Sequence, residues 1–251
     1  MKDIQSQHDS RRINIKKVGV KDISYPITVK DKARSRQHTV ARVNMYVNLP
    51  HHFKGTHMSR FIEILNQARG EITLKSFHAI LKQMRQKLQA EEAHMEIEFP
   101  YFLKKPIHRS NGVQVHEYTC KMHGSLTAAD EENLTLDVTV PILPPSTDQR
   151  DNLLPRSLGH WGIAMISLQF RTFVWIEDII MLVEEVTRHH LSRNTADKSS
   201  AIQLLSVEQL TAELGQKLAE QTDISWFSVQ IENLSEGHST FASLDSSLAN
   251  C

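Results

Sequence analysis

The chain has 251 residues, which is enough for one large domain or two small ones. Lysine plus arginine equals aspartate plus glutamate at 29 each, so no overall field would attract nucleic acid or an acidic membrane. No apolar run approaches the roughly 20 residues that span a bilayer. Residues 1–12 lack the apolar segment of a signal peptide, and two cysteines argue against a disulfide framework. We therefore expect a cytoplasmic protein without nucleic-acid or membrane partners.

The first half of the chain shows two kinds of hydrophobic periodicity. Val43, Met45 and Val47 alternate with smaller or polar residues, which predicts a strand with one face buried. Apolar residues at helical spacing follow, and Gly70 separates two such stretches. The expected strands are 18–29 (broken at Pro26), 39–49, 95–99 and 113–118, and the expected helices are 57–68 and 72–91.

The second half repeats this order. The expected strands are 134–140, 161–170, 226–231 and one near Phe241, and the expected helices begin near Ile176 and Val207. Each half therefore reads β-β-α-α-β-β. This pattern predicts an α+β fold in which helices cover one face of an antiparallel sheet. We expect a polar segment over 1–14 and one bimodular domain over 15–251, with halves of about 15–127 and 131–245. Unpaired sheet edges favour closure into a barrel between subunits.

The most distinctive motif is the octapeptide KGTHMSRF, Lys54 to Phe61. With it, several shorter segments resemble the type IB GTP cyclohydrolases, members of the tunnelling-fold (T-fold) superfamily. These segments are Asp9–Arg11, Ile15–Val20, Tyr25–Ile27, Phe173–Ile179 and Ile231–Asn233 followed by His238. The similarity covers nearly the whole chain.

The resemblance implies an activity and an assembly. Members hydrolyse GTP to 7,8-dihydroneopterin triphosphate and formate for tetrahydrofolate and pterin biosynthesis. They form symmetric tetramers with active sites between subunits, so a homotetramer is expected here. A divalent metal (Mn, Zn or Fe) activates water, since a bound cation lowers the pKa of water from about 15.7 towards 7.

The resemblance also suggests the site residues. Glu208 is expected to anchor the base, because a carboxylate accepts two parallel hydrogen bonds from a guanine-like edge. His238 and His160 are the catalytic candidates, since imidazole exchanges protons near neutral pH. Arg60 and His57 are candidates for substrate binding. Three of these residues have a plainer alternative. Glu208 suits a helix start, where the helix dipole favours negative charge. Arg60 could instead stabilise a subunit contact at the entry of its helix, and His160 suits a strand start.

The chain departs from the family pattern at the metal site. Where the family has a Cys-Pro-Cys-Ser segment and a later histidine ligand, an ungapped alignment places Leu143 and Pro155, which carry no donor atoms. Cys120 and His123 have a spacing that could chelate, although side chains three apart on a strand point to opposite faces. Three hypotheses follow: a cyclohydrolase with rebuilt ligands, a metal-free paralogue that binds a purine or pterin without hydrolysis, or an assembly partner of an intact cyclohydrolase.

Overall fold

The computed structural model describes residues 15–49, 57–68, 70–71, 73–106, 112–142, 162–196, 206–235 and 237–247. Eight strands and four helices lie in these ranges, in the order β-β-α-α-β-β twice over. The strands are β1 (Ile15–Asp31), β2 (Ser35–Leu49), β3 (Ala93–Pro106), β4 (Val113–Leu126), β5 (Glu132–Ile142), β6 (Gly162–Phe170), β7 (Ile224–Ser235) and β8 (His238–Asp245). The helices are α1 (Met58–Gln67), α2 (Leu74–Lys87), α3 (Ile176–Ala196) and α4 (Val207–Ala219).

The strands form an antiparallel sheet in which each strand pairs with the next along the chain, from β1 to β8. The expected α+β class is therefore confirmed. No helix among the described residues is long and apolar enough to cross a membrane. The chain divides into two compact units, residues 1–101 with 120–136 and residues 102–119 with 137–251.

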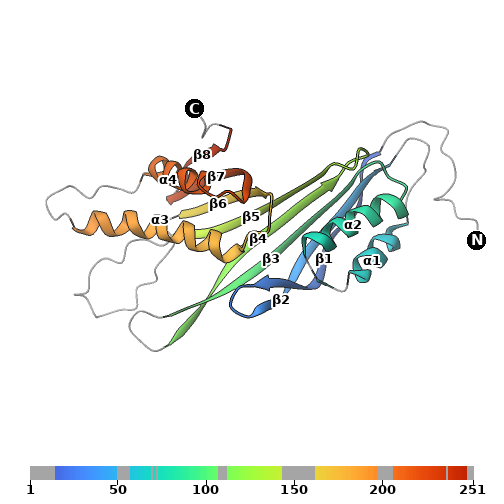
Figure 1. Ribbon diagram of the computed structural model, residues 1–251, viewed down its shortest axis with the longest axis horizontal. Coiled ribbons are helices and arrows are strands. Elements are labelled where there is room, and N and C mark those ends of the chain that lie inside the picture. Colours follow the sequence, from blue (N-terminus) through green and yellow to red (C-terminus); the bar gives the residue numbers. More distant parts are fainter. Residues whose placement is uncertain are drawn as a thin grey trace, which may run out of the picture. The chain divides into compact units, whose positions relative to one another are not determined.

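The first unit buries one face of its strands under two helices. α1 packs against α2 and against β1, and the two helices lie side by side in Figure 1. Alternate residues of β2 and β3 are buried, as period-two patterning requires. The resulting core consists of Val43, Met45, Val47, Phe61, Ile64, Leu65, Phe77, Leu81, Met84, Met95, Ile97 and Phe99. α2 begins at a capping box in which Thr73 and Ser76 exchange side-chain and backbone hydrogen bonds.

The expected break at Pro26 is wrong, because β1 continues through it and Pro26 pairs with Val40. Two residues later, the Thr28 amide turns away from β2 and donates to the Gly70 carbonyl at 2.8 Å. The Pro26 nitrogen lies on this same outer side, so no ladder hydrogen bond is lost there. Gly70 can approach so closely because it lacks a Cβ, which would stand 2.5 Å from the Pro26 carbonyl oxygen, and because its φ is +74°.

The second unit follows the same principle. α4 packs against β7, β8 and α3. β6 and β7 pair in a continuous register from Gly162 opposite Asn233 to Gln169 opposite Trp226. Apolar side chains from the strands and both helices form the core: Val138, Val140, Ile142, Ala164, Ile166, Leu168, Ile179, Ile180, Val183, Leu210, Leu214, Leu218, Val229 and Ile231.

Candidate functional site

The expected base anchor, Glu208, lies in the first turn of α4. Ser206 caps this helix by accepting a hydrogen bond from the Gln209 amide, and its hydroxyl also donates to Glu208 Oε2. The carboxylate is exposed. The hydrogen bond from Ser206, followed by one from the Glu208 backbone, lowers the pKa of Glu208 below its usual value. The side chain is therefore an ionised acceptor at neutral pH, placed where the helix dipole favours negative charge.

The expected proton-transfer residue, His238, begins the edge strand β8. It pairs with Ser235 across the tight turn that contains Gly237, whose φ is +78°. The imidazole is exposed, as are Ser239, Thr240 and Phe241 along the same strand. α4 packs against β8, so Glu208 and His238 lie on neighbouring elements of one unit.

His57 and Arg60 lie at the start of α1 in the other unit. His57 is the N-cap residue and makes no side-chain capping bond, while its carbonyl accepts from the Arg60 amide at 3.1 Å. The Arg60 guanidinium donates to the Lys87 carbonyl at 3.1 Å and so ties α1 to the C-terminal end of α2. Within the described residues, Arg60 thus links α1 to α2, and the residue is exposed.

Lys105, Tyr118 and Glu184 form a cluster that no sequence pattern indicated. The Lys105 ammonium donates to the Tyr118 hydroxyl at 2.6 Å, and that hydroxyl donates to Glu184 Oε1 at 2.6 Å. Lys105 also forms an ion pair with the same carboxylate oxygen. Burial, reinforced by Glu184, raises the pKa of Tyr118 far above its usual value. Burial and the Lys105 charge lower the pKa of His116, two residues along β4. No local pattern could have revealed the cluster, because α3 lies far from β3 and β4 in sequence.

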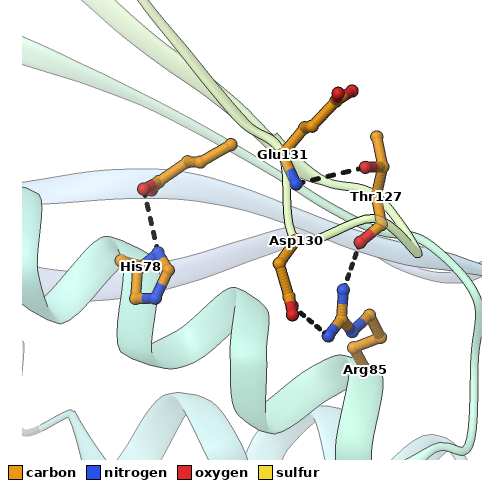
Figure 2. A network of polar contacts seen from close by, with 6 residues as sticks. His78, Arg85, Thr127, Asp130 and Glu131 are labelled. Atoms are coloured by element: carbon orange, nitrogen blue, oxygen red, sulfur yellow. Dashed lines mark hydrogen bonds and ion pairs between the residues drawn. The ribbon is translucent and has the colours of Figure 1, made fainter.

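A second polar network ties α2 to the turn between β4 and β5 (Figure 2). Arg85 donates to the Thr127 carbonyl and forms an ion pair with Asp130, while the Glu131 amide donates to the Thr127 hydroxyl at 3.3 Å. Two helical turns before Arg85, His78 Nδ1 lies 2.8 Å from Glu132 Oε2. The network closes a turn in which Asp130 has a φ of 62°. These contacts fix α2 on its sheet.

The first unit also carries a row of aromatic rings across three strands. The Tyr46 and His94 rings stack with centroids 4.9 Å apart, and His94 stacks with His123 at 6.5 Å. Beside this row, Glu96 accepts hydrogen bonds from Asn44 and Tyr46 at 3.2 Å. Burial acts to raise the pKa of Glu96, but these bonds and nearby positive charge outweigh it, so the pKa is lowered.

Comparison with known proteins decides the family. The family model for type I GTP cyclohydrolase FolE2 matches residues 1–240. The GTP cyclohydrolase FolE2 of Geotalea uraniireducens is 43% identical over 260 residues, covering 98% of this chain and 93% of that protein. The FolE2 of Syntrophus aciditrophicus is 41% identical, covering 95% and 96%. The chain belongs to the FolE2 family of type I GTP cyclohydrolases.

Solved structures support the fold on which this FolE2 chain is built. Urate oxidase from Bacillus sp. TB-90 aligns with a TM-score of 0.57 at 8% identity, covering 92% of this chain and 99% of that one. A uricase from Bacillus fastidious aligns at 0.56 with 9% identity, covering 92% and 93%. At such low identity the likeness concerns the fold alone, which is that of the urate-oxidase-like tunnelling proteins.

The metal that the FolE2 resemblance implies can be tested against the donors present. Cys120 is fully buried on the face of β4 that also carries Tyr118 and Gly124, and Gly124 lies against Phe77 of α2. His123 is on the opposite face, where it stacks with His94. The two side chains therefore cannot chelate one ion, as strand geometry predicted. Among the described residues, no group of three or more His, Cys, Asp or Glu side chains is arranged to hold a metal.

Other residues named from the sequence fall outside the described ranges. They are Leu143 and Pro155, which stand at the family's ligand positions, and His160, the second catalytic candidate. The described part of this FolE2 chain thus shows Glu208 and His238 on adjacent elements of one unit and His57 and Arg60 in the other.

Proposed function

We propose that the protein hydrolyses GTP to 7,8-dihydroneopterin triphosphate and formate, the reaction that supplies pterin for tetrahydrofolate. The observation that carries this proposal is the FolE2 match over residues 1–240, together with 43% identity to a GTP cyclohydrolase along 98% of the chain. The tunnelling fold is compatible with it, and the two-fold β-β-α-α-β-β order supports a chain made of two tandem T-fold units.

In this proposal Glu208 binds the guanine edge. The carboxylate is ionised and exposed, and it offers two oxygens to the parallel N–H donors of the base. His238 on the adjacent strand exchanges protons with the opening ring of the base, because an imidazole side chain can both accept and donate a proton. His160 is a further candidate for this role, and His57 and Arg60 are candidates for contacts to the triphosphate.

A homotetramer is the proposed working form. Strands β1 and β8 are the two ends of the strand order, and edge strands of this kind invite pairing with another chain. Large apolar side chains are exposed close to these edges, with Val40 at 59% and Phe241 at 65%. Glu208 and His238 are exposed too, so a neighbouring subunit would enclose the substrate around them. Light scattering of the purified protein measures the assembly directly.

A divalent cation (Mn, Zn or Fe) remains the cofactor proposed from the family. The described residues do not fit it, and Cys120 is unavailable inside the core. Any metal in this protein would therefore be held without Cys120, and Cys251 is the other cysteine in the sequence.

The proposal is tested by incubating the purified protein with GTP and following pterin fluorescence after oxidation of the product. Manganese, zinc and iron are supplied in separate reactions, and the metal content of the untreated protein is measured in parallel. Glu208→Gln serves as the site variant, and Glu213→Gln, also on α4, serves as the matched control. Product formation that Glu208→Gln abolishes and Glu213→Gln preserves is expected. GTP binding without any product would instead indicate a pocket without hydrolysis.

A further inference from the structure

The Lys105–Tyr118–Glu184 cluster joins three elements of the second unit at one carboxylate oxygen. Glu184 lies on α3, Lys105 near the end of β3 and Tyr118 on β4. Tyr118 stands between the two charged groups, accepting from Lys105 and donating to Glu184 at 2.6 Å in each case. The lysine and glutamate side chains are 23% and 21% exposed, and Tyr118 is 2% exposed. The cluster is therefore a largely desolvated network and not a pair of surface charges.

The shifted pKa values of Tyr118 and His116 bear on this cluster. The raised pKa of Tyr118 keeps the phenol protonated, so it always has a proton to donate to Glu184. The lowered pKa of His116 keeps that neighbouring imidazole neutral near pH 7, so it adds no competing positive charge. One ammonium, one carboxylate and one neutral hydroxyl therefore satisfy each other. Removing one member leaves another partly buried without its partner.

The position of Glu184 on α3 gives the cluster its importance. The buried stripe of the helix includes Ile180, Val183 and Val186, and Glu184 lies at the border of that stripe. At the same turn, the Thr187 hydroxyl donates to the Val183 carbonyl at 2.9 Å and contacts the Glu184 carbonyl at 3.2 Å. Beyond this point α3 continues for more than two further turns to Ala196.

The direction of α3 bears on the proposed substrate anchor. α3 packs against α4, and Glu208 is the second residue of α4. Ser206, the N-cap residue of α4, stands two positions before Glu208. A change in the angle at which α3 leaves the sheet would therefore be transmitted to α4 through the packing of the two helices.

We propose that Lys105, Tyr118 and Glu184 form a positioning cluster that sets the path of α3 and thereby places Glu208 for binding of the guanine base. The proposal rests on the proposed function. None of the three residues contacts substrate in it. Their effect is on where the Glu208 carboxylate stands, so their loss should weaken GTP binding and raise KM more than it lowers kcat.

Two variants test the cluster with different severity. Tyr118→Phe removes the bridging hydroxyl and keeps the ring, and Glu184→Gln removes the charge and keeps the shape. Glu185→Gln is the matched control, because Glu185 is the adjacent, exposed residue on α3. GTP affinity is measured by calorimetry and KM and kcat by pterin formation, all at a temperature where circular dichroism shows each variant folded.

We expect Glu184→Gln to raise the Kd and KM for GTP by about tenfold, with kcat within about threefold, because a loss of only about 1.4 kcal/mol in binding of the base lowers affinity tenfold. Tyr118→Phe should show a smaller shift in the same direction, and Glu185→Gln none. A purely structural role would lower the melting temperature while leaving Kd and KM unchanged, and that result would overturn the proposal. If the unchanged protein binds GTP without turnover, the calorimetric arm still decides. If it neither binds nor turns over GTP, the proposed function fails and this inference with it.

Discussion

Gly124 offers a sharp test of how α2 is seated on β4. It lies on the buried face of the strand, beneath the ring of Phe77, which is itself fully buried. An alanine Cβ at this position would stand 2.2 Å from Phe77 Cε1, 3.0 Å from Cδ1 and 3.1 Å from Cζ. The clash is with a fully buried ring, so Gly124→Ala should destabilise the first unit.

The magnitude follows from the geometry. Carbon atoms pack at about 3.5–4.0 Å, so the ring or the strand must move by roughly 1.3–1.8 Å to accommodate the new methyl group. Overpacking of this kind costs about 1–3 kcal/mol. Replacing glycine by alanine in a strand returns about 0.5–1 kcal/mol. The net loss of about 0–2.5 kcal/mol corresponds to a fall in Tm of up to about 10 °C for a chain of this size.

Thermal and urea unfolding followed by circular dichroism measure this change. Ser125→Ala, one residue along β4 on the opposite face, is the control and should stay within about 0.5 kcal/mol of the unchanged protein. Phe77→Leu should be destabilising alone, yet combining it with Gly124→Ala should recover about 1 kcal/mol, because the methyl group fills space that the ring vacated. Strict additivity of the two changes would refute the packing described for α2 on β4.

Three further predictions concern single contacts. Ser206→Ala removes the main cause of the lowered pKa of Glu208, so this pKa should rise and the loss of GTP binding at acid pH should begin at a higher pH. Ser206→Thr retains the hydroxyl and should leave the pH dependence unchanged. A Kd for GTP whose pH dependence is the same in Ser206→Ala as in the unchanged protein would contradict this. In a Cys251→Ser background, Cys120 should resist a thiol reagent until urea unfolds the protein, and rapid labelling of the native protein would show that it is not buried. Arg85→Met should lower stability by about 1–3 kcal/mol, because the Thr127 carbonyl and Asp130 both lose a charged donor; unfolding curves that overlay those of the unchanged protein would disprove the role of this network.

The fold could be predicted from the sequence wherever the pattern is local. Alternation at Val43, Met45 and Val47 predicted a strand with one buried face, and all three are buried on β2. The helical stripes likewise located α1 to α4. The error at Pro26 came from treating proline as a local breaker, when its tolerance depends on which side of the strand carries the missing N–H. That information lies in the pairing of β1 with β2 and with Gly70.

The candidate site was less accessible to sequence reasoning. The period of two correctly separated Cys120 from His123, because opposite faces of a strand follow from local geometry alone. The partnership of Glu184 with Lys105 and Tyr118 had no such signal. Glu184 lies 79 positions from Lys105 and 66 from Tyr118 in the sequence, so they meet only through tertiary packing. The roles of Glu208 and His238 came from the family resemblance, and the structure adds that both are exposed on adjacent elements of the second unit.

Equimolar release of formate and dihydroneopterin triphosphate from GTP is the most direct test of the central claim. Both products would be quantified by mass spectrometry from one reaction of the purified protein, with and without added manganese, zinc or iron. We predict a ratio of about one formate to one pterin, with loss of both products in Glu208→Gln. GTP that stays intact under every metal condition, while still bound by the protein, would contradict a hydrolytic function for this member of the FolE2 family.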